Sequence, residues 1–198
     1  MGSKQSVALS PDESQEVANR TGFSIAQVNK LYHRFNLLDK DSKGHLSRDD
    51  LLAIPELAMN PLADKIVNLF LPGENNDATS TECGFLKYCE VLSHFRPTNS
   101  KTKESDLNSK QAKTKLIFDI FDKDKSNRLT RNELLEILRM MVGKNISEDQ
   151  LYAIAERAIV EAKQNLDGKS DAGLCLEDFA TAMKSTEIDA KMSVRFHD

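Results

Sequence analysis

The chain has 198 residues, a formal net charge of −4 and 39% hydrophobic residues, and its sequence pI is near 5.7. This acidic balance argues against a general nucleic-acid binder, and the apolar content suffices to bury a core without covalent staples. Three cysteines without CxxC spacing argue against a disulfide framework or a zinc site: Cys83, Cys89 and Cys175. No apolar run approaches the roughly 18 residues that suggest a membrane-spanning helix, so we expect a cytoplasmic protein.

The first residues, Met1-Gly2-Ser3-Lys4-Gln5-Ser6, fit the N-myristoylation pattern, in which removal of the initiator Met exposes Gly2. The alternative is that these letters are a common start or a cloning scar. A single myristoyl chain binds membranes only marginally, so stable anchoring would need a second contact such as a membrane-embedded partner. We expect peripheral association with the plasma membrane or endomembranes.

Apolar residues fall at helical spacing in nearly every segment, and none shows the sustained alternation of a half-buried strand, which predicts an all-α fold. In the first half, Ser24 followed by Gln27 marks a helix start, because the two side chains can form a capping box. Asn60-Pro61 marks another start, with Asn as the cap and Pro at the first helical position. A further helix is predicted over residues 85–95.

The stretch 98–113 is rich in Ser, Asn and Lys, which predicts a flexible linker between two lobes. In the second lobe, helices are predicted near 116–121, 130–142, 147–162 and 176–183. Each lobe then resembles a pair of helix–loop–helix units, joined by short β pairings between their loops. The predicted divisions are an acylation segment with a short helix (1–22), a first pair (23–97), the linker (98–113), a second pair (114–184) and a tail (185–198).

The segment from Asp122 to Glu133 matches an EF-hand calcium loop, whose twelve residues place oxygen ligands at positions 1, 3, 5, 7, 9 and 12. Calcium, a hard cation that accepts an oxygen-only shell, is therefore the expected cofactor. Asn127 replaces the usual Gly at position 6, a mild departure because Asn tolerates positive φ. The alternative is an acidic solvated turn. The candidate ligands are the side chains of Asp122, Asp124 and Ser126, the carbonyl of Arg128, a Thr130 hydroxyl that can hold a water, and both carboxylate oxygens of Glu133.

The segment 39–50 keeps the EF-hand scaffold but not its ligands. Asp39 and Asp41 stand at positions 1 and 3, but Lys43 at position 5 carries an ammonium, which offers no lone pair and repels a cation. Asp50 at position 12 is one methylene shorter than the usual Glu. This first loop is expected either to be vacant or to hold magnesium weakly.

The second and fourth loops depart further from the pattern. Between Phe70 and Phe85 the second loop has about two residues too many, so its charges Glu74, Asp77 and Glu82 are interpreted as solvated. Counting back from Phe179 places the fourth loop at 167–178, with Asp167 at position 1, Asp171 at position 5 and Asp178 at position 12. Lys169 then occupies position 3, and residues 163–166 resemble an insertion. Calcium binding there stays open, and a structural role in pairing is expected.

The helix after the third loop has a wide apolar face, wider than one core seam requires. Flexible Met-rich grooves accept amphipathic helices, so this face is a candidate partner groove. The alternative is that these residues belong to the core. The face comprises Leu134, Leu135, Ile137, Leu138, Met140 and Met141.

Several blocks, in order along almost the whole chain, resemble the calcineurin B homologous proteins, which are relatives of the regulatory B subunit of the phosphatase calcineurin. Ile54-Pro55-Glu56-Leu57 with Asn60-Pro61-Leu62, and the stretch 138–143 with Asn145, are similar to both groups. Other blocks resemble the homologous-protein branch specifically: Thr21-Gly22-Phe23, Leu31-Tyr32, His94-Phe95-Arg96-Pro97, the longer linker, and the tail 191–196.

The resemblance implies a myristoylated calcium-binding cofactor that wraps an amphipathic helix in the cytoplasmic region of a plasma-membrane sodium/proton exchanger. It implies support of the exchanger's stability, surface delivery and activity. It also implies silent first and second hands and calcium in the last two. The third site then maps onto Asp122, Asp124, Ser126, Arg128 and Glu133, whereas the fourth is put in question by the insertion and by Lys169.

Two other functions stay open: the regulatory B subunit of a calcineurin-like phosphatase, which would bind the catalytic subunit, and a plain calcium buffer. A buffer would need several strong loops, and one good loop argues against it. Catalysis is not expected, because the histidines are scattered and no nucleophile elbow, phosphate loop or metal-hydrolase spacing occurs. They are His33, His45, His94 and His197.

Overall fold

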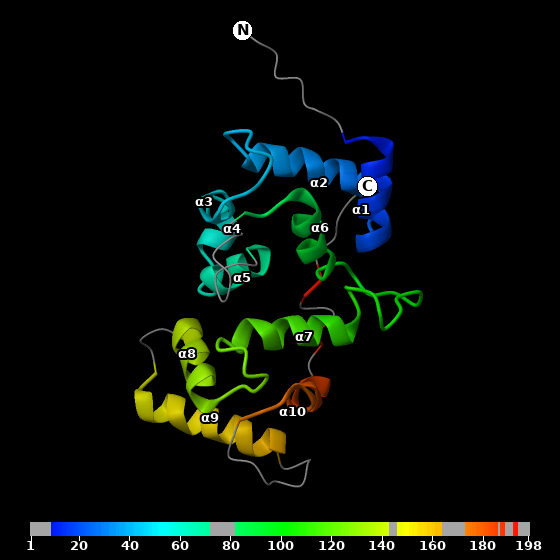
Figure 1. The fold of residues 1–198 in the computed structure, drawn as a ribbon. Coiled ribbons are helices and arrows are strands. Elements are labelled where there is room, and N and C mark those ends of the chain that lie inside the picture. The colour runs from blue at the N-terminus through cyan, green and yellow to red at the C-terminus, as the bar shows by residue number, and fades with distance from the viewer. Residues whose placement is uncertain are drawn as a thin grey trace.

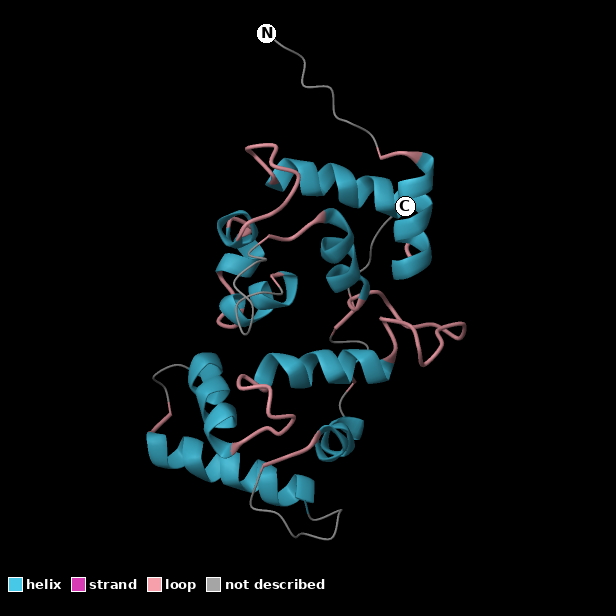
Figure 2. Ribbon diagram, in the orientation of Figure 1, coloured by secondary structure: helices cyan, strands magenta, loops and turns pink. Residues whose placement is uncertain are grey.

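The computed structural model describes residues 9–71, 82–142, 146–163, 173–185, 187–188 and 192–193. Within these ranges the chain is helical, and its loops run between helices grouped in an upper and a lower lobe (Figures 1 and 2). The predicted all-α EF-hand fold is confirmed. None of the described helices has the length and apolar content needed to cross a membrane.

The N-terminal lobe (residues 9–97) is built from short helices with strong start signals. Ser10 with Glu13 and Ser24 with Gln27 each form a complete capping box. Gly22 ends α1 in the left-handed conformation, with φ of 70°. The helices are α1 (Pro11–Thr21), α2 (Ile25–Leu38), α3 (Arg48–Leu52), α4 (Pro55–Ala58), α5 (Ala63–Phe70) and α6 (Phe85–Ser93).

One aromatic core holds this lobe together. Phe35 of α2 lies edge-on to Phe85 and Tyr88 of α6, with ring centroids 5.4 and 5.6 Å apart. Edge-to-face pairs of this kind add about 0.5–1.5 kcal/mol beyond their buried area. Phe35 is 1% exposed and Tyr88 is 3% exposed, so the core joins helices that flank different loops.

The linker is shorter than predicted, because α7 (Lys110–Phe121) begins before residue 113. Ser109 caps the helix by accepting a hydrogen bond from the backbone N–H of Ala112. Lys113 is fully buried, and its Nζ lies 3.0 Å from Ser193 Oγ in the tail. Burial of α7 against distant parts of the chain therefore extends order into a segment whose composition is typical of a linker.

The C-terminal lobe, within the described part of residues 109–193, groups α7 with three further helices. Its core is divided between Phe118 and Phe179, whose ring centroids are 5.8 Å apart, and a cluster of Leu135, Leu151 and Ala155. The further helices are α8 (Arg131–Val142), α9 (Glu148–Lys163) and α10 (Leu176–Ala182), followed by the 3₁₀ turn η2 (Met183–Ser185).

Each pair of loops is joined by one isolated antiparallel bridge, and the short β pairings predicted between the loops do not extend beyond it in the described residues. Leu46 and Cys83 exchange two backbone hydrogen bonds of 2.9 Å in the N-terminal lobe. Leu129 and Leu174 do the same in the C-terminal lobe. Leu46 and Leu129 are the position-8 residues of the first and third loops, and each bridge pairs one of them with the neighbouring loop, as EF-hand pairing requires.

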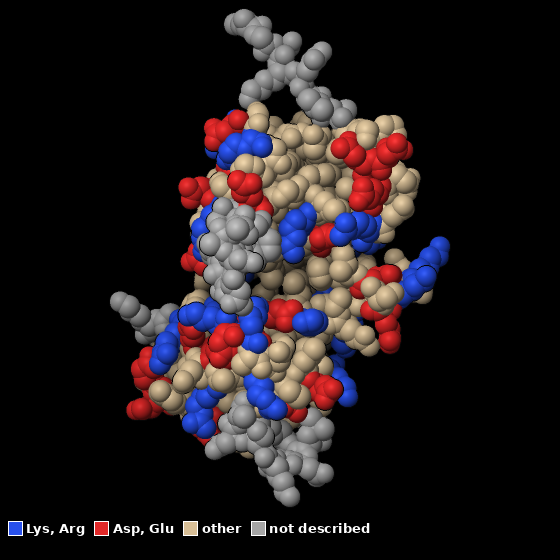
Figure 3. Space-filling view, in the orientation of Figure 1, with Lys and Arg blue, Asp and Glu red and all other residues tan. Residues whose placement is uncertain are grey.

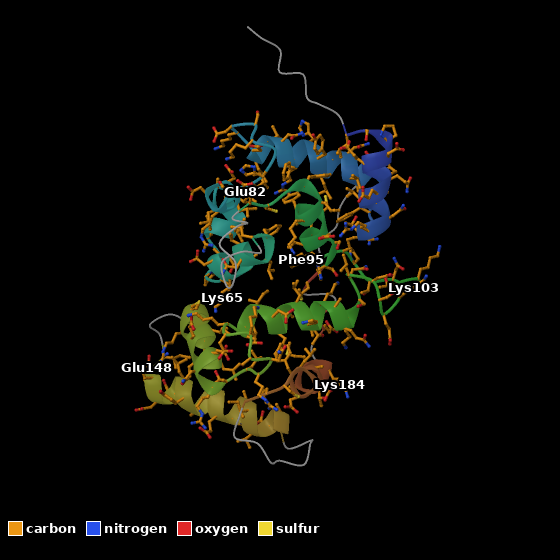
Figure 4. All side chains as sticks on the ribbon, viewed as in Figure 1. Lys65, Glu82, Phe95, Lys103, Glu148 and Lys184 are labelled. Atoms are coloured by element: carbon orange, nitrogen blue, oxygen red, sulfur yellow. The ribbon has the colours of Figure 1, made fainter. Side chains whose placement is uncertain are left out.

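The lobes meet where α5 approaches α7 and α8. Figure 4 shows Lys65 at the lower edge of the N-terminal lobe, above α8. Its Nζ lies 3.9 Å from Glu136 of α8, which also pairs with Lys123 of the third loop at 3.4 Å. Both charge signs alternate along this junction on the visible face (Figure 3).

Candidate metal centre

The third loop joins the end of α7 to the start of α8. Asp122 is the C-cap of α7, and its backbone N–H donates to the Phe118 carbonyl at 2.8 Å. At the other end, Glu133 lies in the first turn of α8 and its side chain accepts from Thr130 N–H at 2.8 Å, which is half of a capping box. The helix signals that end α7 and begin α8 therefore also set the position of both ends of the loop.

Three carboxylates converge inside this loop. One oxygen each from Asp122, Asp124 and Glu133 lie within 4.8 Å of one another. Asp122 is 2% exposed and Glu133 is 8% exposed, whereas Asp124 is open to solvent. No second cluster of this kind occurs within the part of the chain that the structure describes.

Backbone N–H groups hold the carboxylates in place. Asp122 accepts from the N–H of Ser126 at 3.0 Å and of Asn127 at 2.8 Å, and Glu133 also accepts from Lys123 N–H at 2.8 Å. Hydrogen bonds from Ser126 lower the pKa of Asp124. The loop is thus folded around its acidic groups rather than splayed by their repulsion.

The donor set fits calcium. All the predicted ligand groups are oxygens, which is the shell that this hard cation prefers. Ser126 Oγ donates to the Arg128 carbonyl at 3.1 Å, so the ligands of positions 5 and 7 lie side by side. Thr130 Oγ1 donates to Glu133 Oε2 at 2.8 Å. The structure therefore brings together every residue that the sequence assigned to this site.

In the first loop an ammonium lies among the carboxylates. Lys43 Nζ is 2.9 Å from Asp50 Oδ2 and 3.5 Å from Asp41 Oδ2. Burial would raise the pKa of Asp50, but hydrogen bonds from Ser47 and Lys43 outweigh it and lower the pKa to about 2. Sequence reasoning treated Lys43 as a repulsive defect and missed this contact. The sequence feature that could have predicted the contact is a lysine at position 5 between loop carboxylates at positions 3 and 12.

The other loops are described only in part. Glu74 and Asp77 of the second loop, and Asp167, Lys169 and Asp171 of the fourth, lie outside the described residues, as does Gly2. Glu82 is exposed beside the first loop, with Oε1 3.3 Å from His45 Nε2. Asp178 accepts from the backbone N–H of Cys175 at 2.9 Å and so caps α10.

The predicted partner face of α8 packs largely inside its own lobe. Leu135 and Ile137 are 1% and 4% exposed. Leu134 and Leu138 are half-buried against the cluster that Leu135 forms with Leu151 and Ala155 of α9. Met140 is half-buried and lines a hollow of about 440 Å³ between α5, α7 and α8. The side chain of Met141 lies outside the described residues.

Comparison with known proteins gives matches over the whole chain. An EF-hand domain model matches residues 114–143, which contain α7, the third loop and α8. The calcineurin B subunit of Naegleria gruberi is 35% identical over 195 residues, covering 98% of this chain and 99% of that protein. The type 1 calcineurin B subunit of Dictyostelium discoideum is 32% identical over 199 residues, with 100% of both chains covered. Calcineurin B homologous protein 3 of Gallus gallus is 32% identical over 208 residues, covering 99% of this chain and 95% of that protein.

Proposed function

The chain belongs to the calcineurin B family of calcium-binding EF-hand regulatory proteins, and on that premise we propose that it binds an amphipathic helix of a sodium/proton exchanger and supports the exchanger's stability, trafficking and activity. The observation that carries the proposal is the third loop, in which three carboxylates converge to within 4.8 Å between α7 and α8. Such a loop couples an ion to the relative orientation of two helices.

Calcium would be held by Asp122, Asp124, Ser126, the Arg128 carbonyl and Glu133. The ion supplies positive charge that offsets the loop carboxylates. Since Asp122 caps the end of α7 and Glu133 lies in the first turn of α8, an ion bound by both residues would fix the angle between the two helices. That angle sets the shape of the lobe that a partner helix contacts.

Two of the sequence blocks that resemble the homologous-protein branch are in contact in the structure. Arg96 donates from Nη1 to the Thr21 carbonyl at 2.9 Å and lies over the Phe23 ring, 5.3 Å from its centroid. A Cβ at Gly22 would overlap the Arg96 guanidinium. The blocks Thr21-Gly22-Phe23 and His94-Phe95-Arg96-Pro97 thus depend on each other structurally in this chain.

On α8, the half-buried residues are the ones a partner helix would reach first. Leu134, Leu138 and Met140 retain exposed surface, whereas Leu135 and Ile137 serve the core. A partner helix would therefore use the edge of the α8 face and the adjoining hollow beside Met140.

The second candidate is the regulatory B subunit of a calcineurin-like phosphatase. It is favoured by full-length identity of 35% and 32% to proteins named as calcineurin B subunits. In either case the chain acts through a protein partner, and we propose no catalytic activity of its own. Myristoylation at Gly2 would add membrane contact and place the chain at the plasma membrane or endomembranes.

Affinity purification of the full chain with calcium distinguishes the two candidates. Recovery of a sodium/proton exchanger supports the proposal. Recovery of a phosphatase catalytic subunit without an exchanger overturns it in favour of the second candidate.

Calorimetry on Glu133→Gln tests the role of the loop. We expect loss of one calcium site and weaker binding of an exchanger-derived helix. Glu156→Gln is the matched control, because it removes the same charge at an exposed residue of α9 that pairs with Arg131 and does not line the hollow beside Met140. Unchanged calcium stoichiometry and unchanged helix binding in Glu133→Gln would refute the mechanism.

A further inference from the structure

The first and third loops share one backbone geometry, although only the third has a full ligand set. At position 4, Ser42 and Lys125 have φ of 55° and 56°. At position 6, Gly44 and Asn127 have φ of 81° and 60°. The first loop therefore folds as an EF-hand loop despite the lysine at position 5.

The hydrogen bonds that hold position 1 are also repeated. Asp39 accepts from the backbone N–H of Lys43 at 2.9 Å and of Gly44 at 2.7 Å. These donors are the counterparts of Ser126 and Asn127, which bond Asp122 in the third loop. Both oxygens of the position-1 carboxylate thus have partners before any ion is considered.

The remaining carboxylates face the lysine. Lys43 Nζ lies 2.9 Å from Asp50 Oδ2 at position 12 and 3.5 Å from Asp41 Oδ2 at position 3. The Asp50 side chain is 12% exposed and the Lys43 side chain 29%, so the contact lies at the loop surface with the carboxylate as its less exposed partner. An ammonium offers three donors and one positive charge, which suits oxygens that otherwise bind a cation.

We propose that the Lys43 ammonium is a tethered cation that takes the place of a divalent ion in the first loop. The ammonium bridges positions 3 and 12 and so joins the loop to the start of α3. A divalent ion would have to displace the ammonium from the two carboxylates, and the positive charge of Lys43, still tethered nearby, would repel the ion. The first hand is then held in its folded geometry whether or not calcium or magnesium is present.

The effect reaches the second hand through the bridge between the loops. Leu46 follows the lysine by three positions and is fully buried, and its two hydrogen bonds to Cys83 fix the chain just before α6. The tethered cation therefore gives the N-terminal lobe a calcium-independent structure, whereas the C-terminal lobe keeps a loop that takes an ion.

Metal stoichiometry tests the proposal in the full chain with Glu133→Gln, so that the third loop is silent. We expect that adding Lys43→Asp with Asp50→Glu creates one further calcium site by calorimetry, and that adding Lys43→Arg creates none. Two outcomes overturn the proposal: the Glu133→Gln chain binds calcium or magnesium in a way that Asp39→Asn abolishes, or the folded Lys43→Asp/Asp50→Glu chain gains no site.

Stability in the presence of chelator provides a second readout. Lys43→Gln removes the charge but keeps most of the side chain, and we expect it to raise the unfolding equilibrium constant of the N-terminal lobe about 2- to 5-fold. Lys43→Arg, which keeps a cation, should change it far less. Equal stability of Lys43→Gln and the unsubstituted chain would overturn the proposal, while leaving the proposed function of the third loop untouched.

Discussion

Leu129 and Leu174 exchange backbone hydrogen bonds of 2.8 and 2.9 Å, and this bridge ties the third loop to the fourth. The approach is close because Gly173 precedes Leu174 with φ of +86°. A Cβ on Gly173 would lie 2.5 Å from the Leu129 carbonyl oxygen. The bridge therefore needs a residue without a side chain at this point.

Gly173→Ala should destabilise the C-terminal lobe by about 2 kcal/mol or more, since it adds both a left-handed alanine and a backbone clash. Gly44→Ala is the matched control: its φ is +81°, but nothing lies within 4 Å of the added Cβ. That variant should cost only about 1 kcal/mol. Urea unfolding measures both losses, and equal losses would contradict the clash at Leu129.

Backbone strain at position 6 of the third loop should limit calcium affinity. Asn127 has φ of 60°, which glycine adopts freely and alanine adopts at a cost of roughly 1–2 kcal/mol. We expect Asn127→Gly to tighten calcium binding about 2- to 5-fold and Asn127→Ala to weaken it by a similar factor. Calorimetric titration gives the three affinities. If Ala binds calcium as tightly as Gly, strain at this position has no influence.

Features encoded by neighbouring residues could be predicted from the sequence. The capping box of Ser24 and Gln27 and the third loop lie within short windows, and both are where the pattern placed them. The start of α5 was less accurate: Asn60 accepts from Leu62 N–H at 2.8 Å, but the helix begins at Ala63. The Asn60 side chain therefore stabilises a turn that precedes α5 and does not cap the helix itself.

Features that depend on distant partners could not be predicted. Lys113 is buried and bonds the tail residue Ser193, which is far away in sequence, so composition alone indicated a linker. The contact between Arg96 and Thr21 likewise joins α1 to the segment after α6. The ion pair of Lys43 with Asp50 lies within one loop. The sequence alone indicated only that Lys43 repels a cation, and the geometry was needed to show that its ammonium pairs with the Asp50 carboxylate.

The tail should be held to α7 by a hydrogen bond to a buried charge. Ser193→Ala removes the Oγ that lies 3.0 Å from Lys113 Nζ, and Lys113 is fully buried. Hydrogen bonds to charged groups contribute about 1.5–3 kcal/mol, so we expect a loss of this size in unfolding free energy and faster proteolysis of the tail. Ser105→Ala, at an exposed serine, should change stability by less than about 0.5 kcal/mol. Equal effects of the two variants would contradict the docking.

Stability of the N-terminal lobe should fall as the pH drops below about 6.5, because burial lowers the pKa of His94. Its Nδ1 lies 3.0 Å from the Glu90 carbonyl oxygen, to which a neutral ring can donate its Nδ1–H. The unfolded chain binds a proton more readily than the folded one in that range, so protonation favours unfolding. His94→Gln should flatten the pH dependence of urea unfolding between about pH 7.5 and about pH 5, a window that brackets the ordinary histidine pKa of roughly 6.5. An unaltered slope in His94→Gln would show that other groups control it.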